Sequence, residues 1–589
     1  MIKAILLQLL KAPFAASRAR KREREQKLVR HAEALLAARN FDAVIAECRA
    51  LLERGESPAL AAHLCGRACL ALGRPGEARG YLERALKADP QLAGAHADLG
   101  EALFQGGEHE AALDRYRTAI SLAGDGVQYR TRLVELLEQT DRKQDLVVEL
   151  LCLHDLVPGR VDILFKTFAE VSRLGMHAEA VRIAERALAE IGRNFDTLRL
   201  LASARYGAAD MPGAIEACRE AIAIRSNFPD IHVTLGSALF ARGQVAEACE
   251  AYRQSLMIDP EYPDGRFHLG LMQIMQGQYA EGWQGFEYRF RRARRRGMRP
   301  STPPWSGGRV GGGRLLVMRE QGLGDEIMFA SCYGDVMAQA PDALFECEPR
   351  LQALFSRSFP QAQFLPYRPE ETPASESRND IAARVYAGTL PSHFRKSAGS
   401  FPVHRGYLVA DPLRVAYWQE RLAGLGPGLK VGLSWRGGMS FTRQERRSFS
   451  LETMMPVLGT AGVQWINLQY GQRADEIAAL AAKHGIRVHD WPEAIDGDYD
   501  ETAALVSALD LVISVCTSVI HLSGALGKSA WVMTAKVPEW RYGIAGETMP
   551  WYPSVRLFRQ SVQGEWSPVI QRIGEQLSSR LATGQSGSS

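Results

Sequence analysis

The sequence lacks long apolar runs, an excess of one charge and closely paired cysteines. No stretch reaches the ~18 consecutive apolar residues of a membrane-spanning helix, which argues against an integral membrane protein. The 71 Lys and Arg and 67 Asp and Glu leave a net charge of only +4, so nucleic acid is not the expected partner. With 589 residues, 46% hydrophobic and 23% charged, the composition is typical of a soluble globular protein of several domains.

None of the nine cysteines forms a Cys-x-x-Cys pair. Cys65 and Cys69 are four residues apart and would share one face of a helix. We interpret the cysteines as small buried residues in a reducing compartment, which predicts a cytoplasmic protein without zinc sites or disulfides. Their positions are Cys48, Cys65, Cys69, Cys152, Cys218, Cys249, Cys332, Cys347 and Cys516.

Residues 1–27 are predicted to form a basic lead-in. Residues 2–10 are mostly apolar and an arginine cluster follows at residues 18–24, which is the reverse of the order in a secretory signal. We interpret this segment as a solvated helix. The alternative is at most a weak, peripheral contact with a membrane or a partner, through the apolar edge and its basic flank.

A period of 34 residues runs through the first half of the chain. Gly66 and Gly100 are 34 residues apart, and Gly73 and Gly107 keep the same step at a second phase. About eight such units follow one another from residue 28 to residue 291. A glycine at the first phase lets two helices approach closely, a glycine at the second phase ends the first helix, and a proline stops the second helix.

The units resemble tetratricopeptide repeats (TPRs), as LGEALFQGGEHEAALDRYRTAI and LGSALFARGQVAEACEAYRQSLMIDP illustrate. The resemblance implies a superhelix whose groove binds an extended or helical segment of a protein partner. The alternative is that the array is only a spacer or an oligomerisation surface. O-GlcNAc transferases, which also carry TPRs, line this groove with asparagines. This chain has five scattered asparagines, so a partner would be held differently.

The middle units are degenerate, because Val134 and Phe168 replace the glycine of the first phase and Asp141 replaces that of the second. After the array, residues 292–313 are rich in arginine, proline and glycine. We interpret them as a solvated helix end and a hinge, not as a nucleic-acid site. We therefore expect residues 1–297 to fold without the rest of the chain.

From residue 314 the pattern changes to short apolar runs, each followed by a turn and a helix, which predicts parallel strands in an α/β fold. Gly424 to Gly428 form a plausible hinge between two lobes, residues 314–426 and 427–578, before a flexible tail at 579–589. The predicted strands cover residues 315–318, 344–347, 431–435, 463–468, 511–514 and 530–533.

Six motifs of this half of the chain are EQGLGDEIMFA, GLSWRGG, INLQYG, LDLVISVCTSVIHLSGALGK, PEWRYG and PWYPSVRLFRQ. Together they resemble the GT-B glycosyltransferases related to heptosyltransferases. More closely, they resemble bacterial proteins that fuse TPRs to such a unit, including flagellin glycosyltransferases. The resemblance implies two Rossmann-like lobes facing a cleft, a nucleotide-sugar donor held mainly by the C-terminal lobe, and no metal or cofactor.

The helix that begins near Thr517 would offer free N–H groups and a positive dipole end to the donor phosphates. Arg436 would add a charge, while His521 would either donate to the donor or satisfy a local carbonyl. The alternating Asp496, Asp498 and Asp500 are interpreted as a helix-capping loop, not a metal site. The predicted donor-binding residues are Gly322, Gly324, Arg436, Gln469, Thr517, Ser518, His521, Leu522 and Gly524.

Asp325 matches the Gly-Asp of the family and is the first candidate for the general base, with Glu326 as the second. The alternative for Asp325 is a helix N-cap. The chain departs from the family at Cys516, where an aspartate is usual, and a thiol supplies a fixed negative charge only if its pKa is depressed. Four residues of the last motifs are interpreted as structural anchors or, alternatively, as sugar or base contacts: Trp540, Arg541, Trp551 and Tyr552.

Three functions fit these features. The first is a metal-independent glycosyltransferase that moves a sugar from a nucleotide-sugar to Ser or Thr hydroxyls of a protein client, flagellin being one candidate, docked on the repeats. The second is a TPR scaffold or adaptor with an inactive GT-B unit. The third is a transferase acting on lipopolysaccharide or another glycan.

Overall fold

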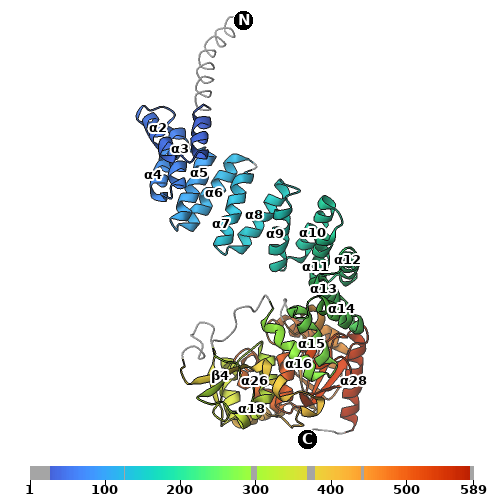
Figure 1. Cartoon of the computed structure of the whole chain (residues 1–589). Helices are drawn as coiled ribbons and strands as arrows, with labels where there is room; N and C mark the ends of the chain where they lie inside the picture. The colour runs from blue at the N-terminus through green and yellow to red at the C-terminus, as the bar shows by residue number, and fades with distance from the viewer. Residues whose placement is uncertain (1–26, 125, 293–301, 368–377, 439–443, 584–589) are drawn as a thin grey trace. The chain divides into compact units, whose positions relative to one another are not determined.

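Helix pairs make up the first part of the chain, and helices combined with mostly parallel strands make up the second (Figure 1). The computed structural model describes residues 27–124, 126–292, 302–367, 378–438 and 444–583. The chain divides between Asp210 and Met211 into two compact units. The predicted lead-in, most of the arginine run after residue 292 and the end of the tail lie outside the described residues.

The first unit is a series of helices, each of which packs against the next, as the 34-residue period predicts. Small and aliphatic residues fill the space between them; Ala61, Ala78 and Leu82, for example, are fully buried. The helices are α2 (Phe41–Glu53), α3 (Pro58–Ala71), α4 (Pro75–Ala88), α5 (Ala93–Gln105), α6 (His109–Ala123), α7 (Val127–Gln139), α8 (Lys143–Leu156), α9 (Val161–Arg173), α10 (His177–Ile191) and α11 (Phe195–Gly207).

The two glycine phases have the roles that the sequence predicts. A Cβ at Gly100 would lie 2.8 Å from the ring of Tyr116 on the next helix, so only glycine allows this approach. Gly107 has a φ of +83° at the turn after α5. The degenerate unit keeps this turn, because Asp141 adopts a φ of +54° at the same phase. A non-glycine residue there costs about 1–2 kcal/mol, but the helix pair forms nevertheless.

The second unit begins with five more helices of the same kind and continues into the α/β region. The last of them, α16, is packed into the α/β core: Trp283 and Phe286 are buried in one cluster with Phe329 and Trp551. The Trp283 indole also donates a hydrogen bond to the carbonyl of Arg395 at 2.8 Å. These helices are α12 (Met211–Ile224), α13 (Pro229–Ala241), α14 (Val245–Ile258), α15 (Pro263–Met275) and α16 (Tyr279–Phe286).

A buried ion pair fixes the end of the repeats to the first strand of the α/β region. Arg289, on the 3-10 turn η1 (Glu287–Phe290), donates through Nε and Nη2 to the two carboxylate oxygens of Glu320 at 2.7 and 2.8 Å. The guanidinium lies between the rings of Phe286 and Phe290. Because Glu320 follows the first strand, the repeats and the α/β region share this contact, and the compact units divide at residue 210 rather than near residue 291.

Two sheets built from parallel strands form the α/β region. The four-stranded sheet has the order β3-β2-β1-β4 and the seven-stranded sheet the order β10-β11-β9-β8-β5-β6-β7, in which only β10 is antiparallel to its neighbour. Chain order therefore reverses between β5 and β8, as in a doubly wound sheet. The strands are β1 (Arg314–Met318), β2 (Leu344–Cys347), β3 (Gln363–Pro366), β4 (Ile381–Tyr386), β5 (Leu429–Ser434), β6 (Val463–Asn467), β7 (Val488–His489), β8 (Leu511–Val515), β9 (Ala530–Thr534), β10 (Thr548–Met549) and β11 (Tyr552–Arg559).

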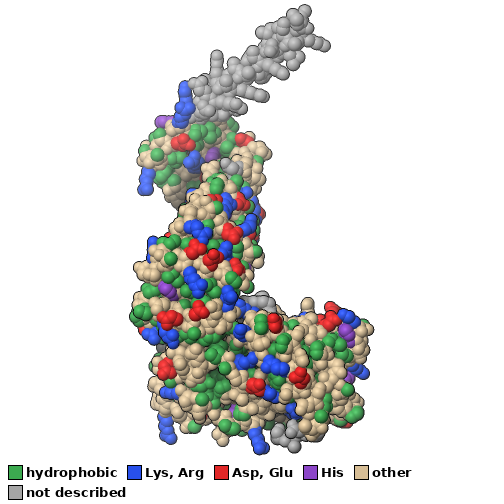
Figure 2. Space-filling view, turned by 90° about the vertical axis from the view of Figure 1, so that its right-hand side faces the viewer, with side chains coloured by type: hydrophobic (Ala, Val, Ile, Leu, Met, Phe, Trp, Pro, Cys, Tyr) green, Lys and Arg blue, Asp and Glu red, His purple; other side chains and the backbone are tan. Residues whose placement is uncertain are grey.

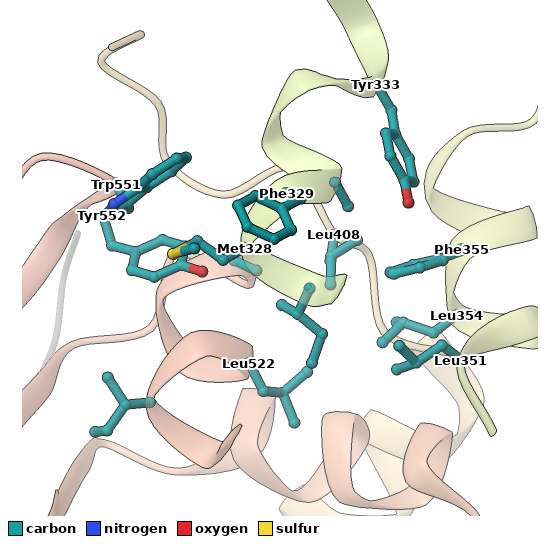
Figure 3. Packing of buried hydrophobic residues seen from close by; sticks show 14 of the residues in the cluster. Met328, Phe329, Tyr333, Leu351, Leu354, Phe355, Leu408, Leu522, Trp551 and Tyr552 are labelled. Atoms are coloured by element: carbon teal, nitrogen blue, oxygen red, sulfur yellow. The ribbon is translucent and has the colours of Figure 1, made fainter. Parts of the chain in front are cut away.

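All six strands expected from the sequence are present, whereas β3, β4, β7, β10 and β11 were not expected. Figure 3 shows part of one of the two hydrophobic cores of this region, with Met328 and Phe329 of α17 beside Trp551 and Tyr552. The helices of this region are α17 (Leu323–Phe329), α18 (Tyr333–Gln339), α19 (Gln352–Ser358), α21 (Leu390–Phe394), α22 (Pro412–Ala423), α23 (Met455–Leu458), α24 (Ala474–His484), α25 (Pro492–Ile495), α26 (Tyr499–Ala508), α27 (Ser518–Ala525) and α28 (Ser567–Ala582).

The surface carries both signs of charge, and basic and acidic side chains are interspersed on the face that Figure 2 shows. Among the helices that the structure describes, none is both long and apolar enough to cross a membrane. All nine cysteines are free thiols and eight are buried, in agreement with their interpretation as small core residues.

Candidate functional site

A pocket of about 940 Å³ opens at the carboxyl ends of strands from both sheets. The loop after β1 contributes residues 321–325, the loops after β5 and β6 contribute Gly438 and Tyr470, and the loop after β8 contributes residues 516–518. In doubly wound sheets ligands bind at this edge, where the chain order reverses. Six of the predicted site residues line the pocket: Gly322, Gly324, Asp325, Thr517, Ser518 and His521.

Two helices begin at the pocket and pack closely there. A Cβ at Gly324 of α17 would lie 2.9 Å from the ring of His521 and 3.3 Å from the Cα of Ser518, both on α27. Thr517 is the N-cap residue of α27, and its hydroxyl contacts that of Ser514 at 3.2 Å. The first turn of α27 therefore presents backbone N–H groups and a positive dipole end at the pocket wall.

His521 is a neutral side chain at this wall. It is only 5% exposed, and its Nδ1 lies 3.2 Å from the hydroxyl of Tyr552. Burial lowers the pKa of His521 to about 3, and the charge of Arg541 acts in the same direction. A neutral imidazole has one donor and one acceptor nitrogen, so His521 is suited to hydrogen bonding but not to carrying a positive charge.

Asp325 lies at the third position of α17 and pairs with an arginine from the other sheet. The N-cap of α17 is Gly322, so the structure does not support the alternative that Asp325 is the N-cap. Instead, Arg541 Nε donates to Asp325 Oδ1 at 2.5 Å. Both side chains are about six-sevenths buried, with exposed fractions of 14% and 16%.

Arg541, interpreted from the sequence as a structural anchor or, alternatively, as a sugar or base contact, is a candidate functional residue of the pocket. It lies on the turn η10 (Trp540–Tyr542) after β9, with its guanidinium 4.6 Å from the centre of the Trp540 ring. Its Nη2 also donates to the Gln321 side chain at 3.4 Å. The PEWRYG motif contained a signal for this role, because it places Glu539 and Arg541 in the loop that follows a buried strand.

A second ion pair, between Arg447 and Glu539, lines the same pocket. Burial raises the pKa of Glu539, although the two neighbouring arginines oppose this shift. Cys516 also lines the pocket, and burial raises the pKa of its thiol well above the usual value. Cys516 is therefore uncharged, and the carboxylates that line the pocket belong to Asp325, Glu539 and Asp496.

Two predicted donor ligands are engaged elsewhere, which corrects the expectation that their side chains face the pocket. Arg436 pairs with Glu476 and donates to the carbonyl of Gln472. The Gln469 side chain accepts from the backbone N–H groups of Trp435 and Arg436 at 3.1 and 2.8 Å. Both residues stabilise the loop after β5, and neither is among the residues that line the pocket.

Leu522 and Gly524 are also packing residues rather than pocket residues. Leu522 is fully buried in the core that Figure 3 shows. A Cβ at Gly524 would lie 2.2 Å from the ring of Tyr552, so the glycine lets β11 approach α27. Leu522 and Gly524 therefore hold the helix that carries His521 in place.

Glu326 points away from the pocket into a buried polar cluster. It is fully buried, its Oε1 accepts from the backbone N–H of Glu348 at 2.7 Å, and its Oε2 lies 3.2 Å from Arg319 Nε. Burial raises the pKa of Glu326 from 4.5 to about 7, although these contacts oppose the shift. This position corrects the expectation that Glu326 is a second candidate base in the pocket.

Glu326 should make stability depend on pH. The native carboxyl keeps its proton up to about pH 7, whereas the unfolded one loses it near 4.5, so stability falls as the pH rises between these values. Glutamine resembles the protonated carboxyl. In Glu326→Gln we expect the fall in unfolding free energy from pH 5 to pH 8 to be smaller by about 2–3 kcal/mol. Urea unfolding at both pH values measures this, and Glu565→Gln, at an exposed carboxylate, is the control. An unchanged difference would contradict the assignment.

Neighbouring repeats of the first unit are joined by charged side chains on their first helices. His63 of α3 lies 2.6 Å from Asp98 of α5, and Arg132 of α7 donates from Nε and Nη2 to Glu101 of α5, each at 2.9 Å. Within the described residues, no three His, Cys, Asp or Glu gather as they would around a metal ion.

Comparison with known proteins identifies the repeats. Two models described as tetratricopeptide repeat match residues 29–93 and 69–137, and one described as TPR repeat matches residues 236–277. TPR units are therefore present in both compact units of the chain. TPR arrays commonly bind protein partners.

One curated relative matches over a longer stretch. Protein FlbA of Caulobacter vibrioides (strain ATCC 19089 / CIP 103742 / CB 15) is 38% identical over 317 residues, which cover 50% of this chain and 52% of FlbA. The chain thus spans about half the length of this relative.

The chain is also similar in part to solved structures. Naa15/Naa10 bound to HypK-THB is 16% identical with a TM-score of 0.38, covering 46% of this chain and 43% of that one. The C-terminal part of a TPR repeat-containing protein from Cytophaga hutchinsonii is 12% identical with a TM-score of 0.30, covering 39% and 95%.

Proposed function

We propose that this chain is a glycosyltransferase of the GT-B type, which transfers a sugar from a nucleotide-sugar to Ser or Thr hydroxyls of a protein docked on its repeats. The observation that carries the proposal is the pocket at the carboxyl ends of two sheets of parallel strands. It contains a carboxylate from one sheet, Asp325, and a cation from the other, Arg541.

The pocket offers the groups that such a transfer requires. A leaving nucleotide needs positive charge near its phosphates, which Arg541, Arg447 and the first turn of α27 provide. Neutral His521 adds a hydrogen-bonding group. An acceptor hydroxyl needs a base, for which the pocket contains the carboxylate of Asp325. The TPR array supplies a surface of the kind that binds protein segments.

A second candidate is a TPR adaptor whose α/β region binds a ligand without turning it over. The uncharged thiol of Cys516 favours it, because the family usually has an aspartate at this position. The ion pair of Asp325 favours it as well, since the carboxylate oxygen that accepts from Arg541 is engaged and does not face an acceptor hydroxyl.

Two measurements on the full-length chain separate these functions. The purified chain is incubated with a panel of nucleotide-sugars, and release of the free nucleotide is followed. In parallel, glycopeptides from cells that carry or lack the gene are compared by mass spectrometry. The transferase predicts nucleotide release and at least one Ser- or Thr-linked glycopeptide that depends on the gene. Absence of both results would leave the adaptor function.

A further inference from the structure

Arg541 binds the loop after β1 through one edge of its guanidinium. Nε donates to Asp325 Oδ1 at 2.5 Å and Nη2 donates to the side chain of Gln321 at 3.4 Å. The guanidinium also lies against the ring of Trp540. The orientation of Arg541 is therefore set by the ring of Trp540 and by two acceptors in the loop after β1, Asp325 and Gln321.

The edge that Arg541 uses here is also the one that binds phosphates. A guanidinium donates two parallel N–H groups to the oxygens of a carboxylate or a phosphate with the same geometry. Two other arginines line the pocket: Arg447, which is paired with Glu539, and Arg350, which is paired with Glu348. Each of these three arginines is thus balanced by a carboxylate, and a diphosphate that enters the pocket must compete with Asp325 for Arg541.

We propose that Arg541 is a phosphate ligand which Asp325 occupies until the donor binds, so that donor phosphates displace the carboxylate and free it to act as the base. This inference rests on the proposed function, because it assigns the phosphates to a nucleotide-sugar donor. A diphosphate carries more negative charge than a carboxylate, so the exchange at the guanidinium favours the phosphates. The exchange itself breaks only the ion pair between Asp325 and Arg541, and no covalent bond changes in it.

The exchange orders the two events in the pocket. The Asp325 oxygen that accepts from Arg541 is engaged, and it becomes available to an acceptor hydroxyl when the guanidinium is taken by another anion. Asp325 would therefore accept a proton from the acceptor hydroxyl only when the donor phosphates are in place. Its position in the first turn of α17 keeps the released carboxylate beside a positive helix end.

Binding of inorganic pyrophosphate to the full-length chain, measured by titration calorimetry, tests this exchange. Asp325→Asn removes the competing charge and keeps the shape, so we expect it to bind pyrophosphate about tenfold more tightly than the wild type. Arg541→Gln should weaken binding by at least about tenfold in the wild-type and the Asp325→Asn backgrounds alike. Arg556→Gln, which removes an exposed charge from the same sheet, should leave the affinity unchanged.

Each outcome of this experiment either supports or overturns the proposed exchange. Equal or weaker binding by Asp325→Asn, or no effect of Arg541→Gln, would overturn it. Asp325→Ala serves as the second variant if Asp325→Asn does not fold, and it carries the same expectation. Tighter binding by Asp325→Asn without any turnover of nucleotide-sugars would support the exchange and refute the proposed transferase. Turnover of nucleotide-sugars by the wild type, without tighter pyrophosphate binding by Asp325→Asn, would support the transferase and refute the exchange.

Discussion

A chain that begins at residue 298 is expected to yield no stably folded protein, whereas a chain that begins at Met211 is expected to fold. The reason is the seam between the last repeats and the α/β region. Trp283 and Phe286 of α16 are buried in the α/β core, and Arg289 forms the buried ion pair with Glu320. A chain starting at residue 298 lacks all three side chains.

The magnitudes make this loss decisive. Removing a buried Trp or Phe side chain costs about 3–5 kcal/mol each. Leaving the carboxylate of Glu320 buried without Arg289 costs about 3–5 kcal/mol more. Together these losses match or exceed the ~5–15 kcal/mol by which a typical domain is stable.

Soluble yield and thermal unfolding followed by circular dichroism measure the effect for residues 298–589, 211–589 and 1–210. Residues 211–589 and residues 1–210 are the controls, and each should unfold cooperatively. If residues 298–589 unfolded cooperatively near the melting temperature of residues 211–589, the seam would be dispensable.

Asp325→Asn is expected to lower the rate of sugar transfer by about 10²–10⁴ while the protein stays folded. Asparagine keeps the size of the side chain and can still accept a hydrogen bond from Arg541, but it cannot take a proton from an acceptor hydroxyl. The measurement is turnover of a nucleotide-sugar, identified from the panel, in the presence of the acceptor protein.

Glu326→Gln is the matched control for this change. It replaces the adjacent carboxylate, which is buried against Arg319 and Glu348 away from the pocket, and it should retain turnover. Near wild-type turnover by Asp325→Asn would show that Asp325 is not the base. A large loss in Glu326→Gln with normal stability would show that the buried cluster takes part in the reaction.

The sequence predicted the repeats and the central strands because tight geometry restricts the residue types. Close helix approach requires glycine at positions such as Gly100, and strands buried on both faces appear as apolar runs. The strands that escaped prediction lack this pattern. β7 and β10 have two residues each, and β4 contains Arg384, which interrupts its apolar run.

The sequence predicted which loops form the site, but it did not predict which partners their side chains contact. Strand ends followed by a helix start predicted that Asp325 and Thr517 would lie near one edge of the sheets, and both line the pocket. Arg436 also follows a strand, yet Glu476, forty residues away, binds its guanidinium. Spacing along the chain cannot show which of several acceptors an arginine will reach, and for the same reason it did not reveal the pairing of Arg541 with Asp325.

The division at residue 210 has a consequence for how such a chain can change over evolutionary time. Each repeat of the first unit contacts mainly its neighbours, so a 34-residue unit can be gained or lost there without disturbing the buried seam. Helices α12 to α16 do not have this freedom, because the last of them belongs to the core around the pocket. Exchange of whole repeats before residue 210 is therefore a route by which the array can change while the residues that line the pocket stay the same.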